Sequence, residues 1–206
     1  MSEEALVYVE RNELRELFKT KLVNAGLPNY LADKTADLMI FADERGIHSH
    51  GSVRTQYYAE RIAKKGLNLD PQFNFEQTGP STGTYFGDNT VGHYVAYEAM
   101  EKAITLAEDS GIGMVGVKEI GHSDAIGYFA EQAAKRGMVA LTVCQSDPMV
   151  VPFGGTEPYF GTNPIAFAAP RENGEPILFD MATTVQAWGK ILDARSKNKS
   201  IPDTWL

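Results

Sequence analysis

The spacing of apolar residues changes near residue 80, and this change constrains the fold more than any other feature of the chain. Before it, apolar residues recur at three- and four-residue steps, which predicts helices over 12–25, 31–44 and 53–65. The stretch 67–80, LNLDPQFNFEQTGP, lacks periodicity and is rich in turn residues, so we interpret it as a linker. Beyond it, apolar strand-like runs alternate with helical segments, which is typical of α/β architecture.

The expected organisation is therefore an N-terminal helical region, 1–70, followed by an α/β domain, 81–206. In the second region the pattern predicts strands over 84–86, 112–120, 138–145, 164–170 and 177–182, and helices over 90–109, over 124–136 and after Thr183 or Thr184.

Charge and cysteine content narrow the classes of function. The chain carries 19 Lys and Arg against 27 Asp and Glu, a net charge of −8, which disfavours a nucleic-acid partner. The single cysteine, Cys144, excludes an internal disulfide. Neither a secretory signal nor an apolar run long enough for a bilayer is present, so we expect a cytoplasmic protein without a membrane partner.

One glycine motif resembles a phosphate-binding turn in a misleading way. GIGMVG, residues 111–116, matches G-x-G-x-x-G, which binds dinucleotides only where a strand precedes it and a helix follows. Here a helix precedes it, so we interpret Gly111 as a helix C-cap and Gly113 and Gly116 as strand glycines that allow close packing.

The segment DERGIHSHG, residues 43–51, gathers titratable side chains between two predicted helices. In an extended chain His48 and His50 would share a face, a spacing that suits a metal. One alternative function is therefore a metal-dependent hydrolase with His48, His50 and His122 as zinc ligands. The competing interpretation is that one of the paired imidazoles caps a helix and the other is exposed.

His122 lies between a predicted strand and a predicted helix whose N-cap would be Ser123 or Asp124. The carboxyl ends of strands in α/β sheets collect ligands. Because a helix N-terminus disfavours positive charge, we expect His122 to be neutral and suited to act as a general base. His93 falls within a predicted helix and is interpreted as structural. The long loop 145–163, rich in Gly and Pro, either lines a site or covers a core.

Four segments carry a resemblance to a known family. ADERGIHSHGSVRTQYYAERI, GHSDAIGYFAEQAAKRG, SDPMVVPFGGTEPYFGTNPIAFAAP and FDMATTVQAWGKILDARS resemble the malate/L-lactate dehydrogenase family, which includes sulfolactate and diketogulonate reductases. The resemblance implies a nicotinamide-dinucleotide-binding sheet that is not of the Rossmann type, with flanking helices. It implies NAD as cofactor, with NADP as the alternative, and no metal.

The resemblance also implies roles for individual residues. His122 matches the proton-transferring histidine, and His50 and Arg54 match the substrate-contacting pair. Arginine suits the carboxylate of a 2-hydroxy acid because its planar guanidinium can bind both oxygens. The remaining assignments are substrate contacts at Ser49, Tyr58 and Asp147, and cofactor contacts at Ser146, Thr162, Asn163, Asp180, Met181 and Ala182.

The substrate expected from the resemblance is ureidoglycolate, oxidised to oxalurate in allantoin and purine breakdown. Malate, lactate, sulfolactate and diketogulonate are the alternatives. Family chains continue beyond SIPDTW with further cofactor contacts, including a lysine, so we expect this chain to lack their C-terminal part. The complete protein is expected to be a homodimer, and a third hypothesis is a truncated remnant without activity.

Overall fold

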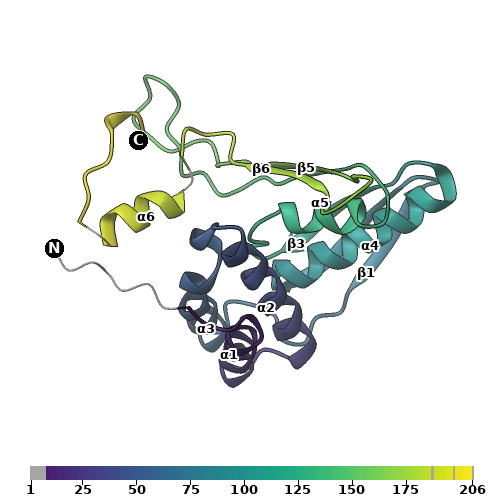
Figure 1. Cartoon of the computed structure of the whole chain (residues 1–206), viewed down its shortest axis with the longest axis horizontal. Coiled ribbons are helices and arrows are strands. Elements are labelled where there is room, and N and C mark those ends of the chain that lie inside the picture. The colour runs from purple at the N-terminus through teal and green to yellow at the C-terminus, as the bar shows by residue number, and fades with distance from the viewer. Residues whose placement is uncertain (1–7, 187, 197, 206) are drawn as a thin grey trace.

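The N-terminal third of the computed structural model is helical, as expected (Figure 1). The structure describes residues 8–186, 188–196 and 198–205. Its first elements are α1 (Arg11–Asn24), α2 (Asn29–Glu44), the short 3₁₀ turns η1 (His48–His50) and η2 (Ser52–Arg54), and α3 (Thr55–Ala63). The helices enclose an apolar core that includes Leu22, Leu31, Met39 and Ile62. This core fixes α3, which contributes Tyr58 and Ile62 to it.

The first sheet has three strands in the order β1-β2-β3. These are β1 (Asn74–Gly79), β2 (Thr82–Thr90) and β3 (Met114–Ile120), and α4 (Gly92–Ser110) connects β2 to the parallel β3. The interpretation of 67–80 as a linker was wrong in its second half, because β1 lies there and pairs antiparallel with β2. Most of its residues are polar or exposed, so backbone pairing rather than burial defines this edge strand.

Gly111 and Gly113 play the roles expected for them, but Gly116 does not serve close packing, because the nearest atom to an added Cβ there is 4.0 Å away. Gly111 ends α4 with φ +84°, a conformation that favours glycine. A Cβ at Gly113 would lie 1.9 Å from the Ala103 carbonyl oxygen, so this glycine allows the chain to cross α4 closely. Gly113 lies just before β3 rather than inside it, whereas Gly116 is within the strand.

A second, separate sheet holds β4 (Ala140–Val143), β5 (Ile165–Ala169) and β6 (Ile177–Met181), all antiparallel in that order. Helix α5 (Gly127–Ala134) covers one face of it and also packs against α4, which covers the first sheet. The α/β class is confirmed, and its strands form two small sheets with helices between them (Figure 1).

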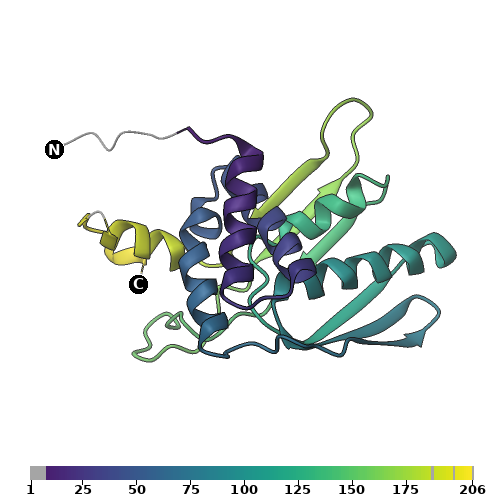
Figure 2. The ribbon, with the colours of Figure 1, turned by 90° about the horizontal axis from the view of Figure 1, so that it is seen from below.

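The other face of the second sheet is apolar and open to solvent. Leu141 and Val143 are 64% and 67% exposed, and Phe167 and Phe179 are 38% and 48% exposed. Among the elements that the structure describes, none covers this face. Figure 2, seen from below, shows α5 in front of the second sheet, on its opposite face. No helix in the described part is long and apolar enough to cross a membrane.

Two predicted helix caps are wrong. Helix α5 begins at Gly127, and its N-cap is Ile126 without a side-chain cap, so neither Ser123 nor Asp124 caps it. Helix α6 (Trp188–Ser196) begins beyond Thr183, whose hydroxyl instead donates to the carbonyls of Thr162 and Asn163. The described chain ends with η3 (Asp203–Trp205).

Candidate active site

Segments far apart in the sequence converge around His122. The loop after β3 carries His122 and Asp124, η1 and η2 carry Ser49 to Arg54, and α3 and α4 contribute Tyr58 and His93. The second sheet is close, because Thr142 of β4 donates from its hydroxyl to the Ile126 carbonyl and Ser123 lies beside the Cys144 thiol. Helix α6 closes on the same region: a Cβ at Gly189 would lie 2.4 Å from Cβ of Ser49.

A continuous hydrogen-bonded chain runs behind His122. The Tyr58 hydroxyl lies 2.7 Å from Nδ1 of His122 and 3.4 Å from Oδ2 of Asp124. The same Oδ2 lies 3.1 Å from Nε2 of His93. The Asp124 and His93 side chains are fully buried, and Tyr58 is 2% exposed. Nδ1 of His122 is thereby linked, through the Tyr58 hydroxyl, to a buried carboxylate.

His122 is held neutral for a reason other than the expected one. The first turn of α5 starts five residues beyond it, so a helix N-terminus does not act on the ring. Instead, loss of surrounding water lowers the pKa of His122 to about 4, and the attraction of Asp124 only partly opposes this. The residue remains accessible to solvent. A neutral imidazole that solvent can reach is able to accept a proton.

His50 lies against His122 with parallel rings, at a centroid separation of 5.9 Å and an interplanar angle of 16°. Its Nδ1 is 2.9 Å from the Ser49 hydroxyl, and burial lowers its pKa. Arg54 donates from Nε to the Ser49 carbonyl oxygen at 2.7 Å, which anchors the guanidinium beside η1. Ser49, His50, Arg54, Tyr58 and His122 are thus brought together.

The geometry does not gather His48 with the other two histidines. The His48 side chain is 76% exposed and its Nδ1 lies 3.2 Å from Asp43. Within the described residues, no group of three or more His, Cys, Asp or Glu side chains could hold a metal ion. The zinc hydrolase hypothesis therefore has no support in this geometry.

A second polar group lies where the long loop leaves β4 and returns to β5. The Ser146 hydroxyl is 3.0 Å from the Thr162 hydroxyl and accepts a hydrogen bond from the Asn163 backbone N–H, also at 3.0 Å. The Ser146 backbone N–H donates to the Asn163 side chain at 3.1 Å. Gly161 permits this approach, since a Cβ there would lie 2.2 Å from the Ser146 carbonyl oxygen.

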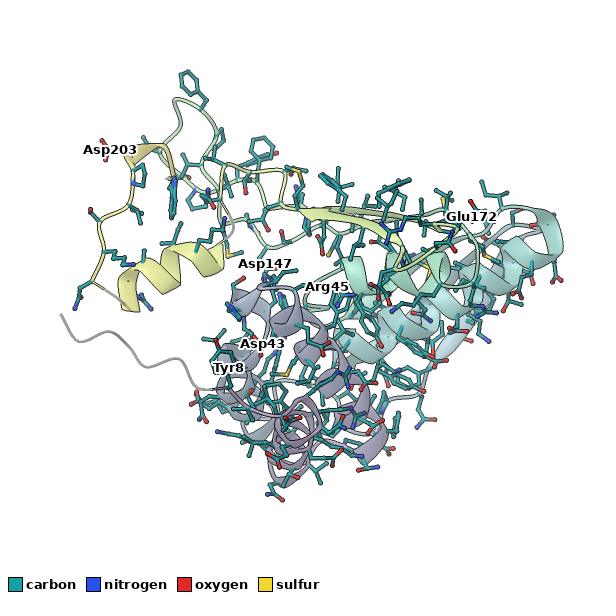
Figure 3. All side chains as sticks on the ribbon, in the orientation of Figure 1. Tyr8, Asp43, Arg45, Asp147, Glu172 and Asp203 are labelled. Atoms are coloured by element: carbon teal, nitrogen blue, oxygen red, sulfur yellow. The ribbon has the colours of Figure 1, made fainter. Side chains whose placement is uncertain are left out.

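The other expected cofactor residues lie at the end of β6. Asp180 accepts a hydrogen bond from the Gly127 backbone N–H at 2.7 Å, and burial raises the pKa of its carboxyl group. Met181 is 49% exposed at the end of β6, and the half-buried Ala182 follows it. Asp147 is exposed and lies on the side of the second sheet toward the N-terminal helices (Figure 3).

Sequence reasoning missed two residues of this site. Asp124 was interpreted as a helix cap and His93 as structural, yet both belong to the chain behind His122. The signal that could have found His93 is a titratable residue on the buried face of α4, alongside Val95 and Ala99.

Comparison with known proteins shows the family of the chain. The malate/L-lactate dehydrogenase family matches residues 9–206. The chain belongs to that family. Ureidoglycolate dehydrogenase (NAD(+)) of Escherichia coli is 55% identical over 197 residues, which cover 96% of this chain and 56% of the relative. Malate dehydrogenase of Pyrococcus abyssi is 41% identical over 203 residues, 98% of this chain and 56% of the relative.

Solved structures extend the match to the fold. Malate dehydrogenase from Entamoeba histolytica superposes with a TM-score of 0.91 at 28% identity, covering 97% of this chain and 55% of that one. The chain thus spans just over half the length of the relatives that it matches.

Proposed function

We propose that this chain supplies the substrate-binding and proton-transferring residues of an NAD-dependent dehydrogenase that oxidises ureidoglycolate to oxalurate. In this reaction the substrate C2 loses a hydride and its hydroxyl loses a proton. His122 accepts the proton, Arg54 binds the carboxylate, and Ser49 and His50 orient the hydroxyl-bearing carbon. Asp147 is a further substrate contact, whereas Tyr58, which the resemblance also assigned to the substrate, is 2% exposed and acts behind His122 in this proposal.

The observation that carries the proposal is the pairing of His122 with His50 beside Arg54. A hydroxyl proton needs a neutral base, and the low pKa of His122 keeps it unprotonated near pH 7. A carboxylate needs a cation with directed donors. Among the described residues, the terminal guanidinium nitrogens of Arg54 have no hydrogen-bond partner, so they are free to bind the substrate carboxylate.

The nicotinamide cofactor, when bound, supplies the hydride acceptor. The chemistry of Ser146, Thr162 and Asn163 fits it, because a carboxamide needs both donors and acceptors and this cluster offers hydroxyl and amide groups of both kinds. Asp180, Met181 and Ala182, at the end of β6, are the second cofactor segment that we propose.

NAD is preferred over NADP in this proposal. A net charge of −8 opposes the more anionic cofactor, and the relative with 55% identity is named for NAD(+). An NADP(+)-named sulfolactate dehydrogenase of Chromohalobacter salexigens is only 30% identical. The competing substrates are malate and sulfolactate, after which relatives with 41% and 35% identity are named.

We further propose a role in allantoin and purine breakdown, a cytoplasmic location and a homodimeric complete protein. The role in allantoin and purine breakdown follows from ureidoglycolate as the proposed substrate. The open apolar face of the second sheet supports assembly with further polypeptide, because so large an exposed patch is a liability in isolation.

The test is a nicotinamide reduction assay with a panel of 2-hydroxy acids. It is run on the chain and on a chimera in which the remaining C-terminal portion of the Escherichia coli relative follows residue 206. We expect the chimera to give the highest kcat/KM with ureidoglycolate and NAD. A higher value with malate or sulfolactate would transfer the proposal to that substrate, and equal or better efficiency with NADP would reverse the cofactor preference. If a folded chimera were inactive with every acid, the proposed dehydrogenase activity would be refuted.

A further inference from the structure

We propose that Asp124 is a positioning residue that acts through Tyr58 to keep the hydrogen of neutral His122 on Nδ1, which leaves Nε2 as the atom that accepts the substrate proton. The inference deepens the proposed function, in which His122 is the base. It concerns two residues, Asp124 and His93, to which the family resemblance assigned no role.

The argument begins with the buried carboxylate. The Asp124 side chain has no exposed surface, and a buried ion is costly unless donors reach it. Burial alone would raise the pKa of Asp124, but the hydrogen bond from His93 holds it below its ordinary value. Asp124 is therefore ionised at neutral pH and acts only as an acceptor.

Two donors are available to this carboxylate. Nε2 of His93 lies 3.1 Å from Oδ2, and the Tyr58 hydroxyl lies 3.4 Å from the same oxygen. The other carboxylate oxygen, Oδ1, has no partner among the described residues. If the hydroxyl hydrogen of Tyr58 pointed elsewhere, His93 would be the only hydrogen-bond donor to the buried carboxylate among these groups. The Tyr58 hydroxyl therefore donates to Asp124.

The direction of the Tyr58 hydrogen then fixes the tautomer of His122. Burial raises the pKa of Tyr58 well above 10, so the phenol keeps its single hydrogen. With that hydrogen directed at Asp124, the oxygen can only accept from Nδ1 of His122, 2.7 Å away. A neutral imidazole carries one N–H, and Nε2 is left with a free lone pair.

The same arrangement stabilises the product of proton transfer. When Nε2 takes a proton, the ring becomes a cation whose Nδ1–H still donates to Tyr58. Of the groups that act on His122, Asp124 attracts the positive charge, while His93, His50 and Arg54 oppose it. A carboxylate that orients an imidazole and stabilises its protonated form is the arrangement of other acid-base enzymes, here with a tyrosine inserted between the two groups.

The backbone at Asp124 guides the choice of variant. Its φ is +66°, a left-handed conformation that asparagine also tolerates. Asp124→Asn therefore preserves the local chain path and removes only the charge. Tyr58→Phe removes the hydroxyl and keeps the ring that packs edge-on against His93 at 5.0 Å.

The experiment measures histidine tautomers by two-bond ¹H–¹⁵N correlation NMR of the 206-residue chain at pH 7.5, with ¹⁵N-labelled histidine and no cofactor or substrate. The four histidines are assigned with single His→Gln variants. We expect His122 to be protonated predominantly on Nδ1, and both Tyr58→Phe and Asp124→Asn to shift it toward the Nε2–H form.

The matched control is Tyr57→Phe. Tyr57 is the neighbouring tyrosine, is 46% exposed and accepts a hydrogen bond only from Arg61 among the described residues, so its loss should leave the tautomer unchanged. Unchanged far-UV circular dichroism of every variant verifies folding.

Two results would overturn the proposal: wild-type His122 protonated on Nε2, or no tautomer shift in Tyr58→Phe. A shift in Tyr58→Phe together with none in a folded Asp124→Asn would also overturn it, because Asp124 would then not direct the tyrosine. If Asp124→Asn does not fold, Tyr58→Phe alone decides. Since the measurement needs no turnover, a correct tautomer with an inactive chimera would refute the proposed function only.

Discussion

The Tyr58 hydroxyl lies 2.7 Å from Nδ1 of His122, although 64 residues separate the two in sequence. This contact joins the helical N-terminal region to the loop that follows β3. The side chain that we propose as the base is thus held by an element from the other part of the fold. Its proposed reactive nitrogen, Nε2, has no hydrogen-bond partner among the described residues.

Replacement of His122 by Asn should leave the fold intact and slow hydride transfer about 10²- to 10⁴-fold, because a positioned base contributes roughly that much. The measurement is single-turnover NADH formation by the chimera. The matched control is His48→Asn, which alters an exposed imidazole of the same region and should leave the rate unchanged. An unchanged rate in His122→Asn would mean that another group takes the proton.

Arg54→Lys should raise KM for the acid even though lysine keeps the positive charge. The reason is that lysine lacks the planar pair of donors that binds both carboxylate oxygens. It also loses the hydrogen bond from Nε to the Ser49 carbonyl. Saturation is measured with the acid and its carboxamide. The wild type should strongly prefer the acid, and the variant should narrow that preference.

Arg61→Lys is the matched control for this prediction, since Arg61 lies on α3 and contacts Gly66 and Tyr57. If Arg61→Lys and Arg54→Lys change the preference equally, Arg54 does not bind the carboxylate.

Acidification should destabilise the folded chain between about pH 6.5 and pH 4. The pKa of His122 falls from 6.5 to about 4 on folding, and that of His50 is also lowered. In this window the unfolded chain binds protons that the folded chain does not. The contribution of these histidines to the free energy of unfolding is therefore fully present above pH 6.5 and is lost as the pH drops. For His122 the slope stays below the limit of about 1.4 kcal/mol per pH unit for one proton, because solvent reaches the ring.

Urea unfolding at pH 7.5 and pH 5 measures this loss. It should be smaller in His122→Gln than in the wild type, and His48→Gln should resemble the wild type. Equal losses in all three chains would show that His122 is not held neutral by the fold.

Sequence periodicity anticipated helices α1 to α6 and strands β2 to β6, and it missed β1. Helices α1, α2 and α4 bury continuous apolar stripes, which a single sequence records. Strand β1 buries little and is defined by its backbone pairing with β2, which composition does not show. The predicted caps failed because a serine or aspartate near a helix start is also free to bind other partners, as Asp124 does.

The site was anticipated unevenly for a related reason. The resemblance singled out His50, Arg54, Tyr58 and His122, and the structure brings them together. It could not show that His93 and Asp124, 31 residues apart, share one buried hydrogen bond. That pairing depends on how α4 packs against the loop after β3, which is a property of the folded chain.

Gly127→Ala should destabilise the chain, although alanine is the better helix former by about 1 kcal/mol. A Cβ at this position would lie 2.9 Å from Oδ2 and 3.1 Å from Cβ of Asp180. The added methyl would therefore push β6 away from α5 and weaken the 2.7 Å hydrogen bond between the Gly127 N–H and Asp180. Overpacking of this kind costs about 1–3 kcal/mol, which exceeds the gain in helix propensity.

Urea unfolding of Gly127→Ala, Asp180→Ala and the double variant tests this contact. The control is Gly116→Ala, where the nearest atom to an added Cβ is 4.0 Å away, so little change is expected. The double variant should lose less stability than the sum of the two single variants, because the second substitution removes the clash that the first creates. Simple additivity, or a Gly127→Ala chain as stable as the wild type, would mean that Asp180 does not fix β6 to the first turn of α5.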